Sequence, residues 1–273
     1  MYVDADQTVY VLEYNNSRLT KWKNGATEGE IVIGKNGDGN RTDQLYLPTD
    51  MIMTKEQNTI IISDGDCSRI VRWLLENGTN GETILSDKNS GYCSLAMDKD
   101  GYLYVSDNDR HEVRRWKIGV ENGTLVAGGN GKGNANNQLD TPGYLFVDSD
   151  YTLYVTDNSN HRVMKWVQNA TEGVRVAGCG SSGTSLSCLS YPRGIFVDQS
   201  GTLYIADADN GRVMSWTKNT QQGSIVVGGN GMGNEPNQLH WPIYLAFDRQ
   251  KNLYVADHYN SRVQKFNAEY VAN

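Results

Sequence analysis

Acidic and arginine side chains recur along the sequence five residues apart. Five of six copies carry the pair: Glu13 and Arg18, Asp64 and Arg69, Asp157 and Arg162, Asp207 and Arg212, and Asp257 and Arg262. A ring of such pairs would bind charged ligands, whereas each pair alone would fix one turn through charge-assisted hydrogen bonds to turn N–H groups. Because nearly every copy has the pair, we favour the structural role. In the exceptional copy, Asp107 is followed at that distance by Glu112.

Glycine-rich loops at 34–40, 128–134 and 228–234 superficially resemble phosphate-binding loops. A phosphate-binding loop needs a helix N-terminus behind it to supply aligned N–H groups. These loops instead lead through Pro48, Pro142 and Pro242 toward segments of strand character. We therefore predict no nucleotide site here, and no cofactor.

The positions that carry this chemistry belong to a long repeat. Its anchors are Tyr10, Ile61, Tyr104, Tyr154, Tyr204 and Tyr254, spaced by 51, 43, 50, 50 and 50 residues. An aromatic residue follows each anchor after twelve positions: Trp22, Trp73, Trp116, Trp166, Trp216 and Phe266. Such a period indicates units that bury their faces against one another. We predict that residues 1–273 form a single domain.

Within the repeat around Tyr204 we predict four short strands, at 194–198, 203–206, 212–216 and 224–227, joined by tight turns. Six such units without helical patterning indicate an all-β fold, a six-bladed β-propeller of four-stranded antiparallel blades. The predicted blades span about 1–34, 48–86, 93–128, 142–178, 192–228 and 242–273, the last ending in a short fourth strand. A linear β-solenoid fits less well, because hairpin turns lie inside each repeat.

Segments 153–163, LYVTDNSNHRV, and 253–263, LYVADHYNSRV, resemble NHL repeats, in which a strand, an Asp and a short turn precede Asn-His-Arg-Val or Asn-His-Arg-Ile. The resemblance covers the whole chain and is weakest in the third copy, which has Arg110-His111-Glu112. It implies a six-bladed propeller. It does not imply one activity, because the family includes binding modules, sensor domains and enzymes.

The sequence has four cysteines, and two of them replace other residue types in one loop. Cys179 and Cys188 stand where the preceding repeat has Gly129 and Gln138, so we expect a disulfide that closes this loop. Cys67 is expected on the same face as Cys93, beside the shortened connection, and we predict a second disulfide between them. Two disulfides indicate an extracellular or secretory location. Four unrelated thiols are the alternative.

Glycosylation sequons are weak evidence for the same location, because the sequence is rich in Asn, Ser and Thr. The candidate glycosylated residues are Asn15, Asn40, Asn77, Asn122 and Asn169. The last three lie in predicted hairpins between the third and fourth strands, where a glycan would be tolerated.

Candidate binding residues follow from the propeller model, in which ligands meet the long interblade loops at the channel mouth. Residues there vary while the framework repeats, and such variation is where a specific function is encoded. The candidates are Asp50, Tyr144, Arg193, Tyr244, His240, Trp241, His258 and Tyr259.

Two functions remain open. A metal-dependent enzyme of the lactonase, esterase or amidating-lyase kind needs converging carboxylates, amides or histidines; the mouth offers one clear acid, Asp50, and the four histidines do not obviously converge. A non-catalytic recognition module needs only a rigid scaffold with aromatic and arginine anchors. We favour the recognition module, leaning against an enzyme, with a protein or glycan as its partner.

Charge and hydropathy exclude other partners. The formal net charge of -7 argues against a broad phosphate-binding surface, so we expect no nucleic acid. No apolar run reaches the roughly 18 residues that span a bilayer, so we expect no membrane insertion of this segment. The first residues carry no leader signature and already belong to a repeat. We therefore expect the chain to be part of a larger protein.

Overall fold

The computed structural model describes residues 1–54, 58–65, 68–75 and 78–271. Its contacts divide into two compact units. The first unit comprises Met1–Arg110 and Arg114–Thr124, and the second comprises His111–Val113 and Leu125–Asn273. The boundary runs through the third sheet.

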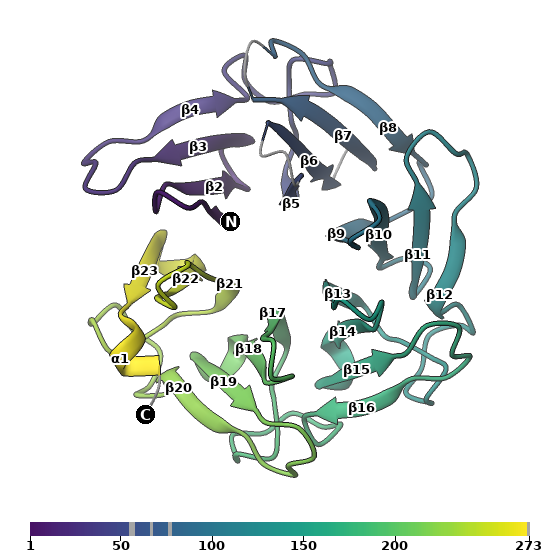
Figure 1. Cartoon of the computed structure of the whole chain (residues 1–273), viewed down its shortest axis with the longest axis vertical. Coiled ribbons are helices and arrows are strands. Elements are labelled where there is room, and N and C mark those ends of the chain that lie inside the picture. The colour runs from purple at the N-terminus through teal and green to yellow at the C-terminus, as the bar shows by residue number, and fades with distance from the viewer. Residues whose placement is uncertain (55–57, 66–67, 76–77, 272–273) are drawn as a thin grey trace. The chain divides into compact units, whose positions relative to one another are not determined.

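The strands of the first half form antiparallel hairpins in chain order (Figure 1). The first sheet contains β1 (Tyr2–Val3), β2 (Val9–Glu13), β3 (Arg18–Trp22) and β4 (Glu30–Ile33). The second contains β5 (Pro48–Met53), β6 (Thr59–Asp64), β7 (Arg69–Leu74) and β8 (Glu82–Ser86). The third contains β9 (Tyr92–Met97), β10 (Tyr102–Asp107), β11 (Glu112–Lys117) and β12 (Thr124–Gly128).

Three further sheets follow in the second unit. The fourth sheet contains β13 (Pro142–Val147), β14 (Leu153–Asp157), β15 (Arg162–Trp166) and β16 (Val174–Ala177). The fifth contains β17 (Pro192–Val197), β18 (Leu203–Asp207), β19 (Arg212–Trp216) and β20 (Ser224–Gly228). The sixth contains β21 (Pro242–Phe247), β22 (Leu253–Asp257) and β23 (Arg262–Phe266). Short 3-10 turns join the second and third strands: η2 (Asn158–Asn160), η3 (Ala208–Asn210) and η4 (His258–Asn260).

The predicted fold class, an all-β six-bladed propeller with four-stranded antiparallel blades, is confirmed. The prediction is wrong at the end of the sixth blade. Where the sequence suggested a fourth strand, Ala268–Val271 form a short helix, α1. Among the described residues this is the single α-helix, and none of their helices is long and apolar enough to cross a membrane.

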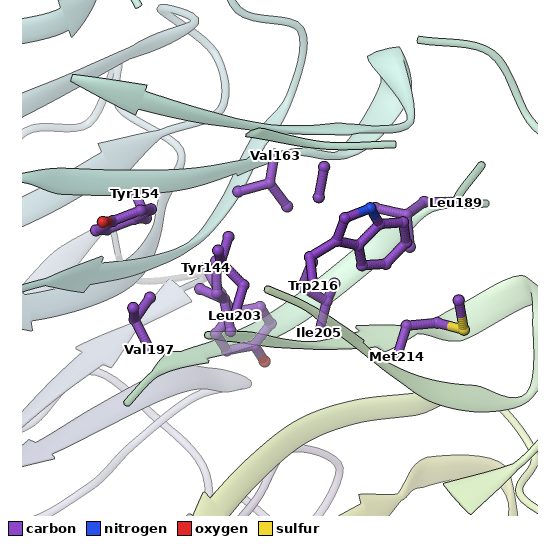
Figure 2. Close-up of a cluster of buried hydrophobic side chains, with 11 residues drawn as sticks. Tyr144, Tyr154, Val163, Leu189, Val197, Leu203, Ile205, Met214 and Trp216 are labelled. Carbon is purple, nitrogen blue, oxygen red and sulfur yellow. The ribbon is translucent and has the colours of Figure 1, made fainter. Parts of the chain in front are cut away.

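The second, third, fourth and fifth sheets bury a tryptophan near the end of the third strand, whereas Trp22 in the first sheet is 37% exposed and Phe266 in the sixth is partly exposed. Trp216 is 1% exposed and packs with Ile205, Met214 and Leu189 in the core of the second unit (Figure 2). Its indole lies so close to Gly223 that any side chain at 223 would collide with the ring. The same glycine precedes the fourth strand in the first five sheets, because a tryptophan at this depth leaves no room for a Cβ.

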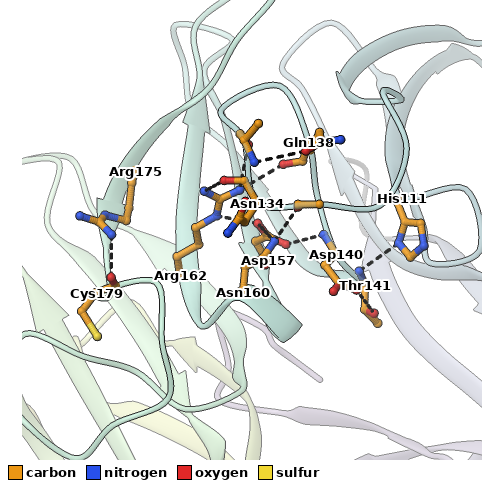
Figure 3. Close-up of polar contacts among 12 residues, drawn as sticks. His111, Asn134, Gln138, Asp140, Thr141, Asp157, Asn160, Arg162, Arg175 and Cys179 are labelled. Carbon is orange, nitrogen blue, oxygen red and sulfur yellow. Dashed lines mark hydrogen bonds and ion pairs between the residues drawn. The ribbon is translucent and has the colours of Figure 1, made fainter.

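The recurring acid and arginine face each other directly in the hairpin register, as Asp157 and Arg162 do. Arg162 Nε donates to Asp157 Oδ2 at 2.7 Å, and its other nitrogens donate to the carbonyls of Asn134, Ala135 and Gln138 at 2.8, 3.1 and 3.2 Å (Figure 3). We call this arrangement the arginine clamp, because one side chain fixes both the hairpin and the loop that enters the sheet. Equivalent clamps are made by Arg69, Arg212 and Arg262.

The structural role predicted for the acids is confirmed, with one correction. The N–H group bound by Asp157 Oδ1 is that of Asp140, 2.7 Å away in the entering loop, and not one in the turn. The carboxylates of Asp64, Asp207 and Asp257 accept a hydrogen bond from the backbone N–H at the same position of the loop that enters their sheets. The third sheet, with Glu112 in place of arginine, differs: Asp107 does accept from turn N–H groups, those of Asp109 and Arg110.

The loops between sheets are closed in two chemically different ways. In the loop before β13, Gln138 Nε2 donates to the Asn130 carbonyl at 3.0 Å, and Gln238 does the same before β21. Before β17 a disulfide joins Cys179 to Cys188, as predicted. The disulfide therefore replaces the glutamine bond at the same loop position. The second predicted disulfide involves Cys67, which lies outside the described residues, and stays a prediction.

The arginine clamp predicts a large difference between two arginine substitutions. Arg162→Ala removes the positive charge beside the buried carboxylate of Asp157 and the donors to three loop carbonyls, and should lower the free energy of unfolding by about 3 kcal/mol or more. Arg72→Ala removes an ion pair with Glu82 in which the side chains are 41% and 61% exposed. Its effect should stay below about 1 kcal/mol. Urea unfolding of both variants measures the difference, and equal losses would contradict the clamp.

Because a disulfide and a glutamine hydrogen bond close equivalent loops, we expect a glutamine to recover part of the stability that is lost when the disulfide is removed. Replacing Cys179 and Cys188 by serine should cost about 2–3 kcal/mol, as expected for a bond that closes so short a loop. The double variant Cys179→Gly with Cys188→Gln places at these two positions the residues that the neighbouring loop has there, Gly129 and Gln138, and should recover about 1 kcal/mol through the glutamine hydrogen bond. Thermal unfolding under identical conditions compares them. If the glutamine variant is no more stable than the serine variant, the two closures are not equivalent.

Candidate functional site

The candidate site is built on a strained backbone position that recurs before the first strand of a sheet. Leu47, Thr141, Tyr191 and Trp241 each precede a proline and have φ angles of 48°, 54°, 55° and 58°. A side chain in this left-handed region costs roughly 1–3 kcal/mol, so the surrounding structure must enforce it. Since the backbone conformation is the same and the side chain differs, this position presents a different group in each of these four sheets.

Hydrogen bonds from the preceding sheet hold three of these positions. The Tyr191 N–H donates to His161 Nδ1 at 3.1 Å, and the Thr141 N–H donates to His111 Nδ1 at 3.2 Å (Figure 3). The Ser17 hydroxyl accepts in the same way from the Leu47 N–H at 3.2 Å. Two of the four histidines are thus structural acceptors. Among the described residues, no group of three or more His, Cys, Asp or Glu is placed to hold a metal ion.

Five of the eight predicted binding residues come together in the second unit. With Tyr191 they form what we call the aromatic cluster: Tyr191, Arg193, His240, Trp241, His258 and Tyr259. They come from three places, namely the segment entering β17, the segment entering β21, and the turn η4. Hydrogen bonds between the hairpins and the loops that enter the sheets bring these three segments together.

Trp241 is the centre of the aromatic cluster. Its ring stacks on Tyr259 with centroids 5.2 Å apart and an interplanar angle of 16°, and lies 6.4 Å from Tyr191 at 23°. The Trp241 indole N–H donates to Asp209 Oδ1 at 2.7 Å. Tyr259 is 58% exposed, although its N–H is tied to the His240 carbonyl at 3.1 Å. The cluster is therefore ordered and accessible.

Arg193 supplies the positive charge of the aromatic cluster. Its Cζ lies 4.9 Å from the Trp241 centroid and 5.1 Å from the Tyr191 centroid, within the range of cation–π attraction. Burial lowers the pKa of His258, and the charge of Arg193 lowers it further. His258 therefore favours the neutral imidazole, which can both donate and accept hydrogen bonds.

The other three predicted residues lie apart from the aromatic cluster. Tyr144 and Tyr244 contact each other edge to face, with centroids 5.4 Å apart, on the first strands of the fourth and sixth sheets. Asp50 belongs to the first unit and is buried, accepting from Ser94 Oγ at 2.6 Å and from the Leu95 N–H at 3.0 Å. Burial raises the pKa of Asp50, and these bonds make it a structural group.

The first unit contains a separate open cavity of about 750 Å³. Its lining includes Asp38, Tyr46, Arg69 and Lys88. Arg69 is occupied by its clamp with Asp64 and the loop carbonyls. Polar and apolar groups line this cavity in nearly equal parts, and the aromatic cluster belongs to the other unit.

The candidate glycosylation sites are exposed where the structure describes them. Asn15, Asn40, Asn122 and Asn169 are all exposed, and Asn77 lies outside the described residues. Asn122 and Asn169 occupy the hairpins between third and fourth strands, as expected. Their modification stays a prediction.

Sequence reasoning missed two members of the site, Tyr191 and Asp209. Tyr191 occupies the same position before a proline as Trp241, so aligning the two loops would have found it. Asp209 lies in the turn η3 and reaches Trp241 only through the tertiary fold. No local signal in the sequence marks that contact.

Comparison with known proteins supports the fold. The NHL repeat model matches residues 239–266. No curated protein matches the sequence. An auxiliary nutrient binding protein from Bacteroides thetaiotaomicron shares the fold with a TM-score of 0.72 and 13% identity, covering 97% of this chain and 68% of that one. A chain of a nidogen/laminin complex has a TM-score of 0.71 and 16% identity, covering 93% of this chain and 87% of that one. A gluconolactonase from Xanthomonas campestris has a TM-score of 0.64 and 16% identity, covering 82% of this chain and 73% of that one.

At these identities the solved structures show the likeness of fold alone, and they include both binding proteins and an enzyme. The matched repeat spans the end of the loop and β21, β22, η4 and β23 of the sixth sheet. The same Asp, Asn and Arg contacts recur in the fourth and fifth sheets. The chain is a six-bladed β-propeller whose sixth sheet contains an NHL repeat.

Proposed function

We propose that the chain is a non-catalytic recognition module that binds a protein or glycan partner through the aromatic cluster on the loop face of the propeller. The observation that carries the proposal is the set of rings around Trp241, with Arg193 against two of them. Tryptophan, tyrosine and arginine are the residues that contribute most to binding at recognition surfaces.

The order of the aromatic cluster supports a binding role. Trp241 is fixed by its bond to Asp209, and Tyr259 by its backbone bond to the loop. Rigid aromatic side chains lose little conformational entropy when a ligand binds, so more of the contact energy remains as affinity. A nutrient binding protein and a chain of a laminin complex share this fold, which accommodates ligand and protein binding.

The location that we propose is extracellular or within the secretory pathway. The Cys179–Cys188 disulfide supports it, because such bonds persist in oxidising compartments. Exposed sequons in the outer hairpins accord with it.

The proposed function predicts that binding depends on the stacked rings of Trp241, which is partly exposed, and Tyr259, which is 58% exposed. The protein, tagged and oligomerised, is applied to arrays of glycans and of extracellular proteins. Trp241→Ala and Tyr259→Ala should each weaken the captured interactions at least tenfold, as for residues at the centre of an interface. Tyr14→Ala is the matched control, because Tyr14 is an exposed tyrosine, 41% accessible, in the corresponding turn of the first sheet.

Two outcomes would contradict the proposed function. If Trp241→Ala and Tyr259→Ala both bind the ligands as strongly as the unchanged protein does, the binding site lies outside the aromatic cluster. Turnover of lactone or ester substrates by the purified chain supplied with calcium or zinc, at rates lost on chelation, would favour the enzyme reading of this fold.

A further inference from the structure

We infer that the aromatic cluster binds a sugar that carries a carboxylate, and that Arg193 pairs with this carboxylate. The inference rests on the proposed function and narrows its ligand to one chemical class. Four features of the second unit support it. No described carboxylate pairs with Arg193, and the nearby Asp209 already accepts two hydrogen bonds. The rings of Trp241 and Tyr259 are nearly parallel, and the backbone carbonyls of the adjacent loop already accept hydrogen bonds.

Within the part of the chain that the structure describes, no carboxylate forms an ion pair with Arg193. Every clamp arginine has a carboxylate within 3 Å, as Arg212 has in Asp207 at 2.7 Å. Arg193, in contrast, forms no ion pair or hydrogen bond with any described residue; it contacts the rings of Tyr191 and Trp241, and its buried Nε has no acceptor. A half-buried cation without an acceptor is costly, and a ligand carboxylate would relieve that cost with short, charge-assisted bonds.

The acid that contacts the aromatic cluster is already engaged. Asp209 Oδ1 accepts the Trp241 indole N–H at 2.7 Å, and Oδ2 accepts the Ser190 hydroxyl at 3.1 Å. Both oxygens of Asp209 are therefore used to orient Trp241 and the loop. The electrostatic effect of Arg193 on His258, whose pKa it helps to lower, also indicates that positive potential extends across the cluster.

The rings beside Arg193 offer a surface suited to a sugar. Trp241 and Tyr259 are nearly parallel, and Tyr259 projects into solvent. A pyranose ring has an apolar C–H face that packs on aromatic rings, while its hydroxyl groups stay at the edge. The half-buried imidazoles of His240 and His258 border Tyr259, 5.1 Å from it, and can hydrogen-bond such hydroxyls.

The backbone around the aromatic cluster disfavours an extended acidic peptide. A peptide that adds to a sheet or loop needs backbone groups that are still unpaired. In the loop before β21, the carbonyls of Asn234, Glu235 and Gln238 already accept from Arg262. A compact ring with one carboxylate makes use of the groups that remain, namely the aromatic rings, the imidazoles and Arg193.

The test measures binding of the whole chain by calorimetry to oligosaccharides ending in glucuronate, galacturonate or sialic acid. Each is paired with its methyl ester, which keeps the sugar and removes the charge. At least one acid should bind. Its methyl ester should bind with an affinity at least about tenfold lower, the loss expected for one charge-assisted pair. A tetra-glutamate peptide forms a separate arm.

Variants assign the carboxylate to Arg193. Arg193→Gln should reduce binding of the acid to the level of its ester and leave ester binding unchanged, and Arg193→Lys should retain part of the preference. Arg249→Gln, at an exposed arginine in the turn between β21 and β22, is the matched control and should change neither. Thermal unfolding of each variant verifies that the fold is intact.

Three results would overturn the inference. Equal binding of acid and ester would show that the charge is not recognised, although the cluster would remain a glycan site. Binding of tetra-glutamate without any sugar would assign the cluster to acidic peptides. No binding of any sugar would exclude this ligand class, while array ligands lost in Trp241→Ala would still support the proposed function.

Discussion

The rest of the structure depends on an ion pair with a buried aspartate in four of the six sheets, and on the bonds that its arginine makes beyond the pair. Asp157 and Arg162 fix the turn between them, and the remaining guanidinium N–H groups bind carbonyls 24 to 28 residues earlier in the chain. One side chain therefore stabilises both the local hairpin and its contact with a distant loop. Because a buried charge tolerates few alternatives, these four repeats are held to the same loop geometry.

That constraint explains how variable residues become a site. In the second, fourth, fifth and sixth sheets the clamp fixes the loop before the first strand, and the loop ends in a residue held at positive φ before a proline. The backbone there is set by the framework, so its side chain is free to vary without loss of the fold. In the fifth and sixth sheets the varied residues are Tyr191 and Trp241, and adjacent turns add His258 and Tyr259.

The repeat period and strand pattern were enough to predict the fold class and most strands from the sequence. Arg212–Trp216 was predicted to the residue, because its ends are marked by the clamp arginine and the core tryptophan. The end of the sixth sheet was not predictable, since Ala268–Val271 lacks the residues that mark a fourth strand elsewhere. Asp50 was misjudged as a surface candidate because its buried bonds to Ser94 and Leu95 join residues 44 and 45 positions apart.

The same reasoning located five members of the aromatic cluster but not their arrangement. The stacking of Tyr259 on Trp241 joins two separate segments of the sixth sheet, and the placement of Arg193 depends on a contact between the fifth and sixth sheets. Neither contact has a local sequence signal. The most direct test of the account is a crystal structure of the chain with a captured ligand. The account predicts electron density against Trp241 and Tyr259, within reach of Arg193. Ligand density confined to the cavity beside Tyr46 and Lys88 would contradict it.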